Sequence, residues 1–216
     1  MKYDKEMILK DMSFIIKKGT KVTIAGRTGV GKTTLTNVLM KLYNIESGKI
    51  LIDNYDISEI STKCLRNNIS YISQNPYIFA DTVRNNITLG NKEITDKQIN
   101  DLIYEMGVEN LFNKLNDGLD TKIKLSKLSY GELQIIAFIR AILHKANIYI
   151  FDEPTSNIDL KTERMIQNII DKISQKSTVI IIAHRKSTIE NSDKIIYLKD
   201  GQIDMIVNKE KCSNFK

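Results

Sequence analysis

Hydrophobic residues in this chain follow two patterns, short continuous runs and positions three or four residues apart. Residues 22–25 and 148–151 are runs of strand length, rich in β-branched or aromatic side chains. Residues 32–43 instead carry apolar side chains at helical spacing. Further strand-like runs cover residues 69–73, 178–182, 194–198 and 202–207, and a further helix is predicted over residues 160–173. This alternation predicts an α/β fold with a mostly parallel, helix-covered sheet.

The middle of the chain, from about residue 81 to residue 143, has a different pattern. Thr95 is a favourable N-cap, and the apolar residues after it recur every three or four positions. Residues 116–118 (Asn-Asp-Gly) are typical of a turn. We therefore predict a mainly helical segment between two strand-rich segments.

Composition narrows the class of protein. The 216 residues suffice for one sizeable core, and no apolar run is long enough to span a membrane. The cysteines, Cys64 and Cys212, have neither a paired spacing nor a histidine cluster nearby, so we expect free thiols. The net charge is +6, but the lysines are scattered, and residues 209–211 (Lys-Glu-Lys) form the tightest group. We expect a solvated surface and no nucleic-acid site.

A glycine-rich loop separates the strand at residues 22–25 from the helix at residues 32–43. It matches G-x-x-x-x-G-K-[ST], in which glycines let backbone N–H groups surround phosphates at a helix N-terminus. Lys32 would reach the β- and γ-phosphates, and the Thr33 hydroxyl would ligate Mg²⁺. An inconsequential glycine turn is disfavoured by the strand and helix around it. The predicted nucleotide-contacting residues are Gly26, Arg27, Thr28, Gly29, Val30, Gly31, Lys32, Thr33 and Thr34.

Two acidic residues follow the strand-like run at residues 148–151. Asp152 and Glu153 would lie at the carboxyl end of a parallel strand, where open α/β sheets bind ligands, and Pro154 would end that strand. Asp152 would hold the Mg²⁺ of the nucleotide through water, and Glu153 would polarise an attacking water as general base. An acidic pair alone is often a solvated edge. Together with the phosphate loop it predicts a nucleotide-hydrolysing site.

With these motifs the chain resembles the nucleotide-binding domain of an ABC transporter over nearly all of its length. Tyr3 stands where the family has an aromatic residue that stacks on adenine. The remaining family motifs appear in family order: the Q-loop at residues 71–76, the signature at 128–132, the D-loop at 156–159 and the switch-histidine loop at 183–185.

The resemblance implies a role for each of these motifs. Gln74 would contact Mg²⁺ and the attacking water, which a neutral amide can orient without acting as a competing base. His184 would donate a hydrogen bond to the γ-phosphate, whereas a lone histidine at a strand end would more often be structural. Ser129 and Gly131 would contact the nucleotide, and Tyr3 would stack on its base. The implied ligands are ATP and Mg²⁺, with the metal held by Thr33, Gln74 and Asp152.

The resemblance also implies an architecture. It is a P-loop NTPase core with a mostly parallel sheet, a small antiparallel β subdomain and an inserted α-helical subdomain. Residues 1–80 and 146–216 would form the core with the β subdomain, and residues 81–145 the helical signature subdomain. In the family two such domains meet head to tail, so that the signature of one caps the γ-phosphate bound to the other. The implied partners are a second nucleotide-binding domain and the transmembrane domain of an exporter, at the cytoplasmic face of the cell membrane.

Other classes of protein with the same phosphate loop fit less well. Residues 79–87 and 183–188 resemble exporters more than importers. ABC ATPases of chromosome maintenance separate their motifs by a long coiled coil, but Lys32 and Asp152 are only 120 positions apart without sustained heptads. Those of translation usually carry two cassettes in one chain. A small-molecule kinase would lack the Q-loop, signature and switch histidine.

The signature departs from the family pattern at two positions. Tyr130 and Glu132 replace the first glycine and the glutamine of L-S-G-G-Q, which brings bulk and negative charge toward a phosphate. Alternatively, Ser129 and Glu132 form a capping box for the helix that follows. If the signature is impaired, the chain would be a half-site with weak or no hydrolysis in a heterodimeric ABC assembly.

Both ends of the chain look shortened relative to the family. We expect a domain from a longer polypeptide with its own transmembrane helices, and a separate subunit is the alternative. His144 is expected to be structural, because a cation suits the end of a helix.

Overall fold

The computed structural model describes residues 2–3, 6–124 and 128–209. Its main sheet has six strands in the order β10-β9-β3-β8-β7-β6. Five of them run parallel, and only the edge strand β10 is antiparallel to its neighbour. The strands are β3 (Lys21–Ala25), β6 (Ile69–Ile72), β7 (Ile148–Asp152), β8 (Thr178–Ala183), β9 (Lys194–Lys199) and β10 (Gln202–Asn208). Each agrees to within one residue at either end with the strand predicted from the sequence, and the predicted fold class is confirmed.

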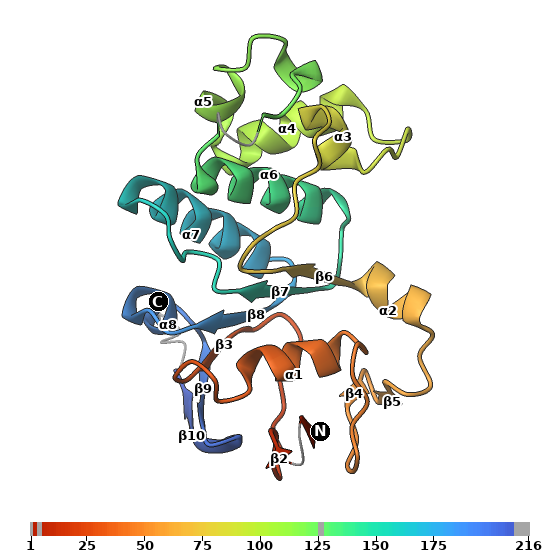
Figure 1. The fold of residues 1–216 in the computed structure, drawn as a ribbon, viewed down its shortest axis with the longest axis vertical. Helices are drawn as coiled ribbons and strands as arrows, with labels where there is room; N and C mark the ends of the chain where they lie inside the picture. Colours follow the sequence, from red (N-terminus) through yellow and green to blue (C-terminus); the bar gives the residue numbers. More distant parts are fainter. Residues whose placement is uncertain (1, 4–5, 125–127, 210–216) are drawn as a thin grey trace, which may run out of the picture.

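Helices cover both faces of this sheet (Figure 1). One face carries α1 (Lys32–Leu39), and the other carries α6 (Tyr130–Leu143) and α7 (Leu160–Ser174). Alternate residues of β7 accordingly enter different cores: Phe151 packs beneath α6 and α7, and Ile150 packs with α1. Burial on both faces explains why the sequence shows continuous apolar runs.

The remaining helices lie at one end of the molecule or beside the sheet (Figure 1). Thr95 caps α4 with a full capping box, as its position predicted. At the far end from α1 lie α3 (Val83–Thr88), α4 (Asp96–Met106), α5 (Glu109–Phe112) and the short 3₁₀ helix η1 (Gly118–Asp120). The others are α2 (Thr62–Asn68) and α8 (Lys186–Glu190).

Two small antiparallel sheets complete the fold. They consist of β1 (Lys2–Tyr3) with β2 (Glu6–Met7), and of β4 (Leu51–Ile52) with β5 (Tyr55–Asp56). They accord with the predicted antiparallel β structure in the first part of the chain.

The helix after the glycine-rich loop is shorter than predicted. Its apolar spacing continues to Leu42, but α1 ends at Leu39 in a Schellman motif: the N–H of Leu42 bonds the carbonyl of Asn37, and that of Lys41 bonds Val38. Lys41 holds the left-handed position (φ 57°) where glycine is the usual residue. Its ammonium group donates to the carbonyls of Ser58 and Ile60, at 3.0 and 2.7 Å. These long-range contacts stabilise the end of α1 at a position that the local sequence does not predict.

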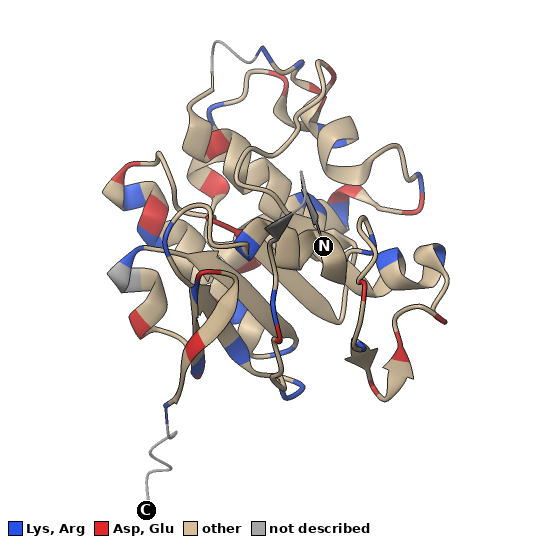
Figure 2. Ribbon diagram, turned by 60° about the horizontal axis from the view of Figure 1, so that its bottom comes forward, with Lys and Arg blue, Asp and Glu red and all other residues tan. Residues whose placement is uncertain are grey.

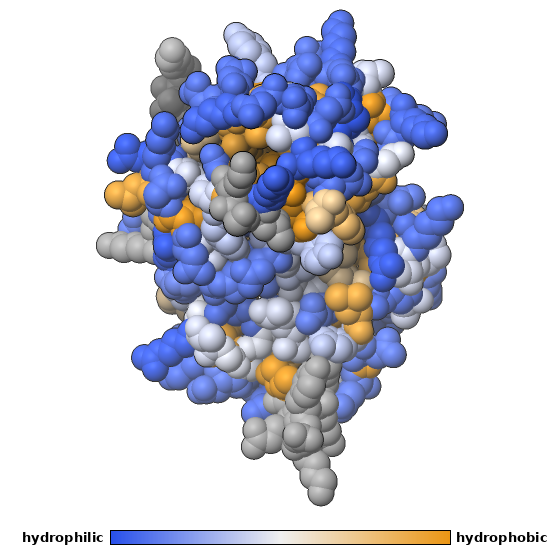
Figure 3. All heavy atoms as spheres, turned by 45° about the horizontal axis from the view of Figure 1, so that its top comes forward, coloured by the Kyte–Doolittle hydropathy of each residue, from blue (hydrophilic) through white to orange (hydrophobic). Residues whose placement is uncertain are grey.

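Charges of both signs are interspersed over the ribbon (Figure 2). The face in Figure 3 is mostly hydrophilic, and its hydrophobic side chains lie in separate small groups. No helix among the described residues is both long and apolar enough to cross a membrane.

Candidate functional site

The glycine-rich loop connects the end of β3 to the first turn of α1. Gly31 is the N-cap of α1 in a left-handed conformation (φ 100°), and a Cβ there would come within 2.8 Å of Leu9 Cδ2. The left-handed backbone therefore favours glycine, and a larger residue would also have to displace the Leu9 side chain. Within the described residues, no side chain caps α1 and no acidic residue occupies its first turn. The N–H groups at this helix end are thus arranged to receive an anion.

The side chain of Lys32 is buried beneath the same loop. Its Nζ atom donates to the carbonyl oxygens of Gly26 and Arg27, both at 2.8 Å. Burial lowers the pKa of Lys32, and the nearby carboxylates of Glu153 and Asp152 oppose that shift. An additional negative charge at the loop would favour the ammonium form further, which suits a phosphate.

Asp152 lies at the carboxyl end of β7, facing the start of α1. Its Oδ2 atom accepts a hydrogen bond from the Tyr71 hydroxyl at 3.1 Å, and the Thr33 hydroxyl lies 3.5 Å from the same atom. Burial raises the pKa of Asp152; the Tyr71 hydrogen bond opposes this, and the charge of Glu153 adds to it. Burial also raises the pKa of Tyr71, so the phenol remains a hydrogen-bond donor. A cation beside Asp152 would offset the unfavourable burial of its charge.

Glu153 is the centre of a second cluster. Gln74 donates from Nε2 to Glu153 Oε2 at 3.3 Å, and Nδ1 of His184 lies 3.2 Å from Oε1. The same Gln74 nitrogen also lies 3.3 Å from the hydroxyl of Ser156, a buried residue. Glu153 therefore contacts both of the other residues proposed from the sequence as catalytic.

The backbone of Glu153 is left-handed, with φ 47°. This conformation is uncommon for a residue with a long side chain and costs about 1–3 kcal/mol at functional sites. A hydrogen bond from its N–H to the carbonyl of Ile182 on β8 helps to hold it, at 2.9 Å. It turns the chain immediately after the strand, so that Asp152 faces α1 while Glu153 faces Gln74.

The signature residues lie at the start of α6 and make hydrogen bonds within their own chain. Ser129 and Glu132 form a complete capping box: Ser129 N–H donates to Glu132 Oε2 at 2.9 Å, and Glu132 N–H donates to Ser129 Oγ at 3.2 Å. A Cβ on Gly131 would approach Thr162 Cγ2 of α7 to 2.5 Å, so close helix packing already requires this glycine.

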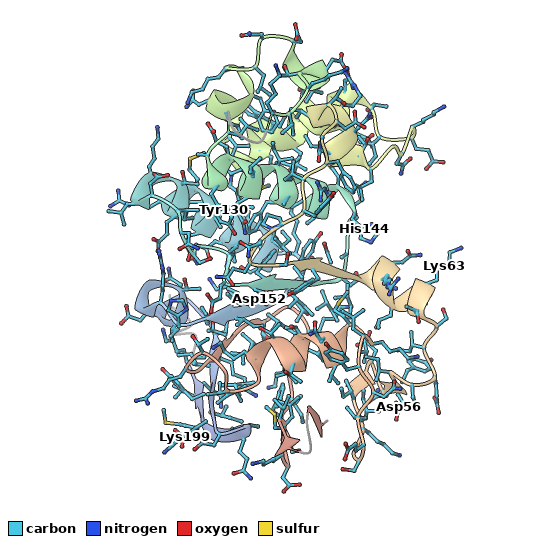
Figure 4. The ribbon with its side chains drawn as sticks, viewed as in Figure 1. Asp56, Lys63, Tyr130, His144, Asp152 and Lys199 are labelled. Atoms are coloured by element: carbon cyan, nitrogen blue, oxygen red, sulfur yellow. The ribbon has the colours of Figure 1, made fainter. Side chains whose placement is uncertain are left out.

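Tyr130, in place of the first signature glycine, turns toward the Q-loop. Its hydroxyl donates to the carbonyl of Gln74 and lies 3.0 Å from the side-chain oxygen of Asn75. Figure 4 labels Tyr130 at the start of α6 and Asp152 at the end of β7, on neighbouring layers of the fold.

Two predicted residues lie apart from these clusters. The backbone of Tyr3 belongs to β1, whereas its side chain lies outside the described part of the structure. His144 caps the C-terminus of α6, and its Nε2 lies 2.9 Å from the carbonyl oxygen of Arg66. This placement agrees with the structural role predicted for His144.

The sequence analysis missed two tyrosines that contact this site. Tyr71 lies within the Q-loop segment and Tyr130 within the signature, but neither was assigned to the chain's own Asp152 or Gln74. Strand alternation could have indicated the face of β6 on which Tyr71 lies, but not that β7 is its neighbour. No local signal connects Tyr130 with Gln74, because they are 56 positions apart.

The residues present fit ATP with Mg²⁺. Glycine backbone and buried Lys32 suit phosphates, and the oxygen atoms of Thr33 and Asp152 are the hard ligands that Mg²⁺ prefers. Among the described residues no group of three or more His, Cys, Asp or Glu side chains could hold an ion. Mg²⁺ bound by few protein ligands typically takes the rest from substrate phosphates and water.

Known proteins resemble this chain over most of its length. Residues 9–156 match the family model described as "ABC transporter". The chain is 38% identical over 204 residues to an ATP-dependent lipid A-core flippase of Francisella tularensis, covering 93% of this chain and 34% of the flippase. It is 41% identical over 198 residues to an export ATP-binding/permease protein of Rickettsia typhi, covering 91% of this chain and 34% of that protein. The chain thus spans about a third of the length of these relatives.

A solved structure is similar over almost the whole chain. It is that of a bacterial Atm1-family ABC exporter with ATP bound, with a TM-score of 0.88 and 32% identity. The match covers 96% of this chain and 37% of the exporter chain.

Proposed function

This chain belongs to the ABC transporter family, as an exporter-type ATP-binding domain, and from this we propose that it binds and hydrolyses ATP with Mg²⁺ to power export across a membrane. The main support is the arrangement at one edge of the sheet. The first turn of α1, which follows the predicted phosphate loop, lies beside Asp152, and the next residue, Glu153, contacts Gln74 and His184.

The proposed chemistry assigns a separate task to each cluster. Loop N–H groups and Lys32 would bind the β- and γ-phosphates. To do so, the Lys32 ammonium group would replace its hydrogen bonds to the carbonyls of Gly26 and Arg27 by hydrogen bonds to phosphate oxygens. Bound Mg²⁺, held by Thr33, by Gln74 and, through water, by Asp152, would neutralise charge that develops on the phosphates. Glu153 would accept a proton from the attacking water.

Gln74 and His184 would keep the Glu153 carboxylate in position. With Nδ1 protonated, neutral His184 donates to Glu153 and leaves Nε2 without a proton. Its proposed hydrogen bond to the γ-phosphate would then require the imidazolium form or a turn of the ring.

We further propose the assembly implied by the family. The partners would be a second nucleotide-binding domain, in an ATP-dependent homo- or heterodimer, and the transmembrane domain of an exporter. The chain would thus act at the cytoplasmic face of the cell membrane. Residues 81–145 would form the helical signature subdomain, and residues 1–80 with 146–216 the ATP-binding core with its β subdomain.

A half-site within a heterodimer is the alternative function. The observation that favours it is the chemistry of the signature, where a tyrosine and a glutamate replace a glycine and a glutamine. In this case the isolated chain would bind ATP but turn it over slowly or not at all.

Phosphate release by the purified chain tests the proposal. We expect release from ATP that requires Mg²⁺, and we expect Lys32→Ala to weaken ATP binding at least about tenfold by calorimetry, because it removes a charged hydrogen-bond donor. Binding without release would favour the half-site. Unchanged affinity in Lys32→Ala would contradict the assignment of the phosphate loop. Phosphoryl transfer to an acceptor molecule would indicate a kinase instead.

A further inference from the structure

The segment between β6 and α3 lies along α6 and is held by it at two places. It includes Gln74, which contacts Glu153, and Phe79, which lies nearer to α3 (Figure 1). Near its far end, Arg140 in the last turn of α6 donates from Nη1 to the carbonyl of Tyr77 at 2.9 Å, and the Arg140 guanidinium lies over the Phe79 ring. Near its first end, Tyr130, the first residue of α6, bonds the carbonyl of Gln74.

These two anchors lie ten residues apart on one helix, which corresponds to about 15 Å. The far anchor is reinforced by Asn86 of α3, which receives the N–H of Phe79 at 2.8 Å and donates to the carbonyl of Phe79 at 3.0 Å. The near anchor depends on a side chain long enough to cross from α6 to Gln74. Glycine at position 130 could not make this contact.

Gln74 is therefore held on both sides. Its backbone carbonyl accepts from Tyr130, and its side-chain amide donates to Glu153 and Ser156. We propose that Tyr130 is a positioning residue that fixes the backbone of Gln74 and thereby keeps the Gln74 amide on Glu153. The inference rests on the proposed function for its catalytic part, in which Glu153 is the general base.

This proposal gives the altered signature a role within its own chain. Tyr130 replaces a glycine that, by the family resemblance, would face the nucleotide bound to a partner domain. The Tyr130 hydroxyl instead contacts Gln74 and Asn75 of the same chain, next to the carboxylate of Glu153. The start of α6 and the general base are thus connected through Gln74. A displacement of α6 would move the amide that orients Glu153.

Tyr130→Phe tests the proposal, because it removes the hydroxyl and keeps the ring. Tyr104→Phe is the matched control, since Tyr104 is an exposed tyrosine on α4 with 76% of its surface accessible. By hydrogen exchange with mass spectrometry, Tyr130→Phe should speed exchange of the amides of residues 74, 75 and 77–79 about fivefold, the factor expected for one hydrogen bond. Tyr104→Phe should leave that segment unchanged.

Kinetics test the catalytic part. We expect Tyr130→Phe to lower kcat severalfold with ATP affinity unchanged, and we expect this loss to vanish in a Gln74→Ala background, where the positioned amide is absent. Unchanged exchange of residues 74–79, or an equal loss of kcat with and without the Gln74 amide, would overturn the inference. If the wild-type chain releases no phosphate, the proposed function fails, and the exchange comparison still decides whether Tyr130 holds the segment.

Discussion

The hydroxyl of Tyr71 donates a hydrogen bond to Oδ2 of Asp152 across 3.1 Å. The two residues belong to adjacent parallel strands, and the contact lies at the end of the sheet where α1 begins. It restricts the orientation of the carboxylate that is proposed to hold Mg²⁺. A hydrogen-bond partner of a metal-binding carboxylate tunes how strongly the site binds its metal.

Tyr71→Phe should therefore lower the apparent affinity for Mg²⁺ more than the affinity for the nucleotide. We expect the Mg²⁺ concentration for half-maximal phosphate release to rise about three- to tenfold, the range for one lost hydrogen bond. Titration with Mg²⁺ at saturating ATP measures it, and binding of Mn²⁺ followed by electron paramagnetic resonance gives an independent value. Tyr55→Phe, on the exposed β5, is the control. Equal Mg²⁺ dependence in both variants would show that Asp152 needs no support from Tyr71.

Glu153→Gln should separate ATP binding from hydrolysis. The amide is nearly isosteric and can still contact Gln74 and His184, but it cannot accept a proton from water. We expect steady-state phosphate release to fall by at least about 100-fold while the Kd for ATP stays within about threefold. Undiminished turnover in this variant would exclude Glu153 as the base.

Asp152→Asn should stabilise the nucleotide-free chain at neutral pH. Burial raises the pKa of Asp152 in the folded chain, so the folded state binds the carboxyl proton more tightly than the unfolded state does. The stability that this proton contributes is lost as the pH rises through the folded pKa. At pH 7 the buried charge therefore opposes folding, and asparagine removes it.

Thermal unfolding of both chains measures this effect. We expect the Tm of Asp152→Asn to exceed that of the wild type by a few degrees at pH 7, and the difference to shrink as the pH falls toward the ordinary pKa of aspartate. Mg²⁺ with ATP should raise the Tm of the wild type much more than that of the variant. A variant that is less stable than the wild type at pH 7 would contradict the assigned sign.

Glu132→Ala should destabilise the fold through the start of α6. It removes the side chain that receives the Ser129 N–H, and we expect a loss of about 0.5–1 kcal/mol in the free energy of unfolding by urea denaturation. Glu132→Gln preserves the capping box and should stay within about 0.3 kcal/mol of the wild type.

The same glutamine variant tests whether the Glu132 charge opposes dimerisation. Because the Glu132 carboxylate is bonded to its own chain, Glu132→Gln should leave the ATP-dependent dimer fraction of Glu153→Gln unchanged in sedimentation. A large gain in dimer would mean that the carboxylate faces the phosphates of a partner domain.

The sequence predicted those elements whose burial leaves a periodic signal. The strands at residues 148–151 and 178–182 are covered on both faces, so each shows a continuous apolar run. The phosphate loop and the acidic pair were recognisable because each chemistry needs residue types at fixed spacing. The left-handed turn at Glu153 had no such signal, because its backbone is held by a hydrogen bond to β8 and is not favoured by its side chain.

Contacts between distant segments were the other features that the sequence could not supply. From the sequence, Tyr71 is a residue of a strand and Tyr130 is an altered residue of the signature. Their hydroxyls can form hydrogen bonds with Asp152 and Gln74 only after the strands and helices have packed together. The early end of α1 has the same origin, since Lys41 is held in a glycine-like conformation by carbonyls 17 and 19 positions away.

The left-handed backbone at Glu153 affects which substitutions at this position selection would favour. Asparagine or glycine would relax that backbone and increase the stability of the fold, so selection for stability alone would remove the glutamate. A glutamate at this position is therefore better explained by a role in turnover than by the stability of the fold. Libraries screened for heat resistance without a nucleotide-dependent assay should therefore enrich replacements at this position, and the same replacements should disappear when turnover is selected.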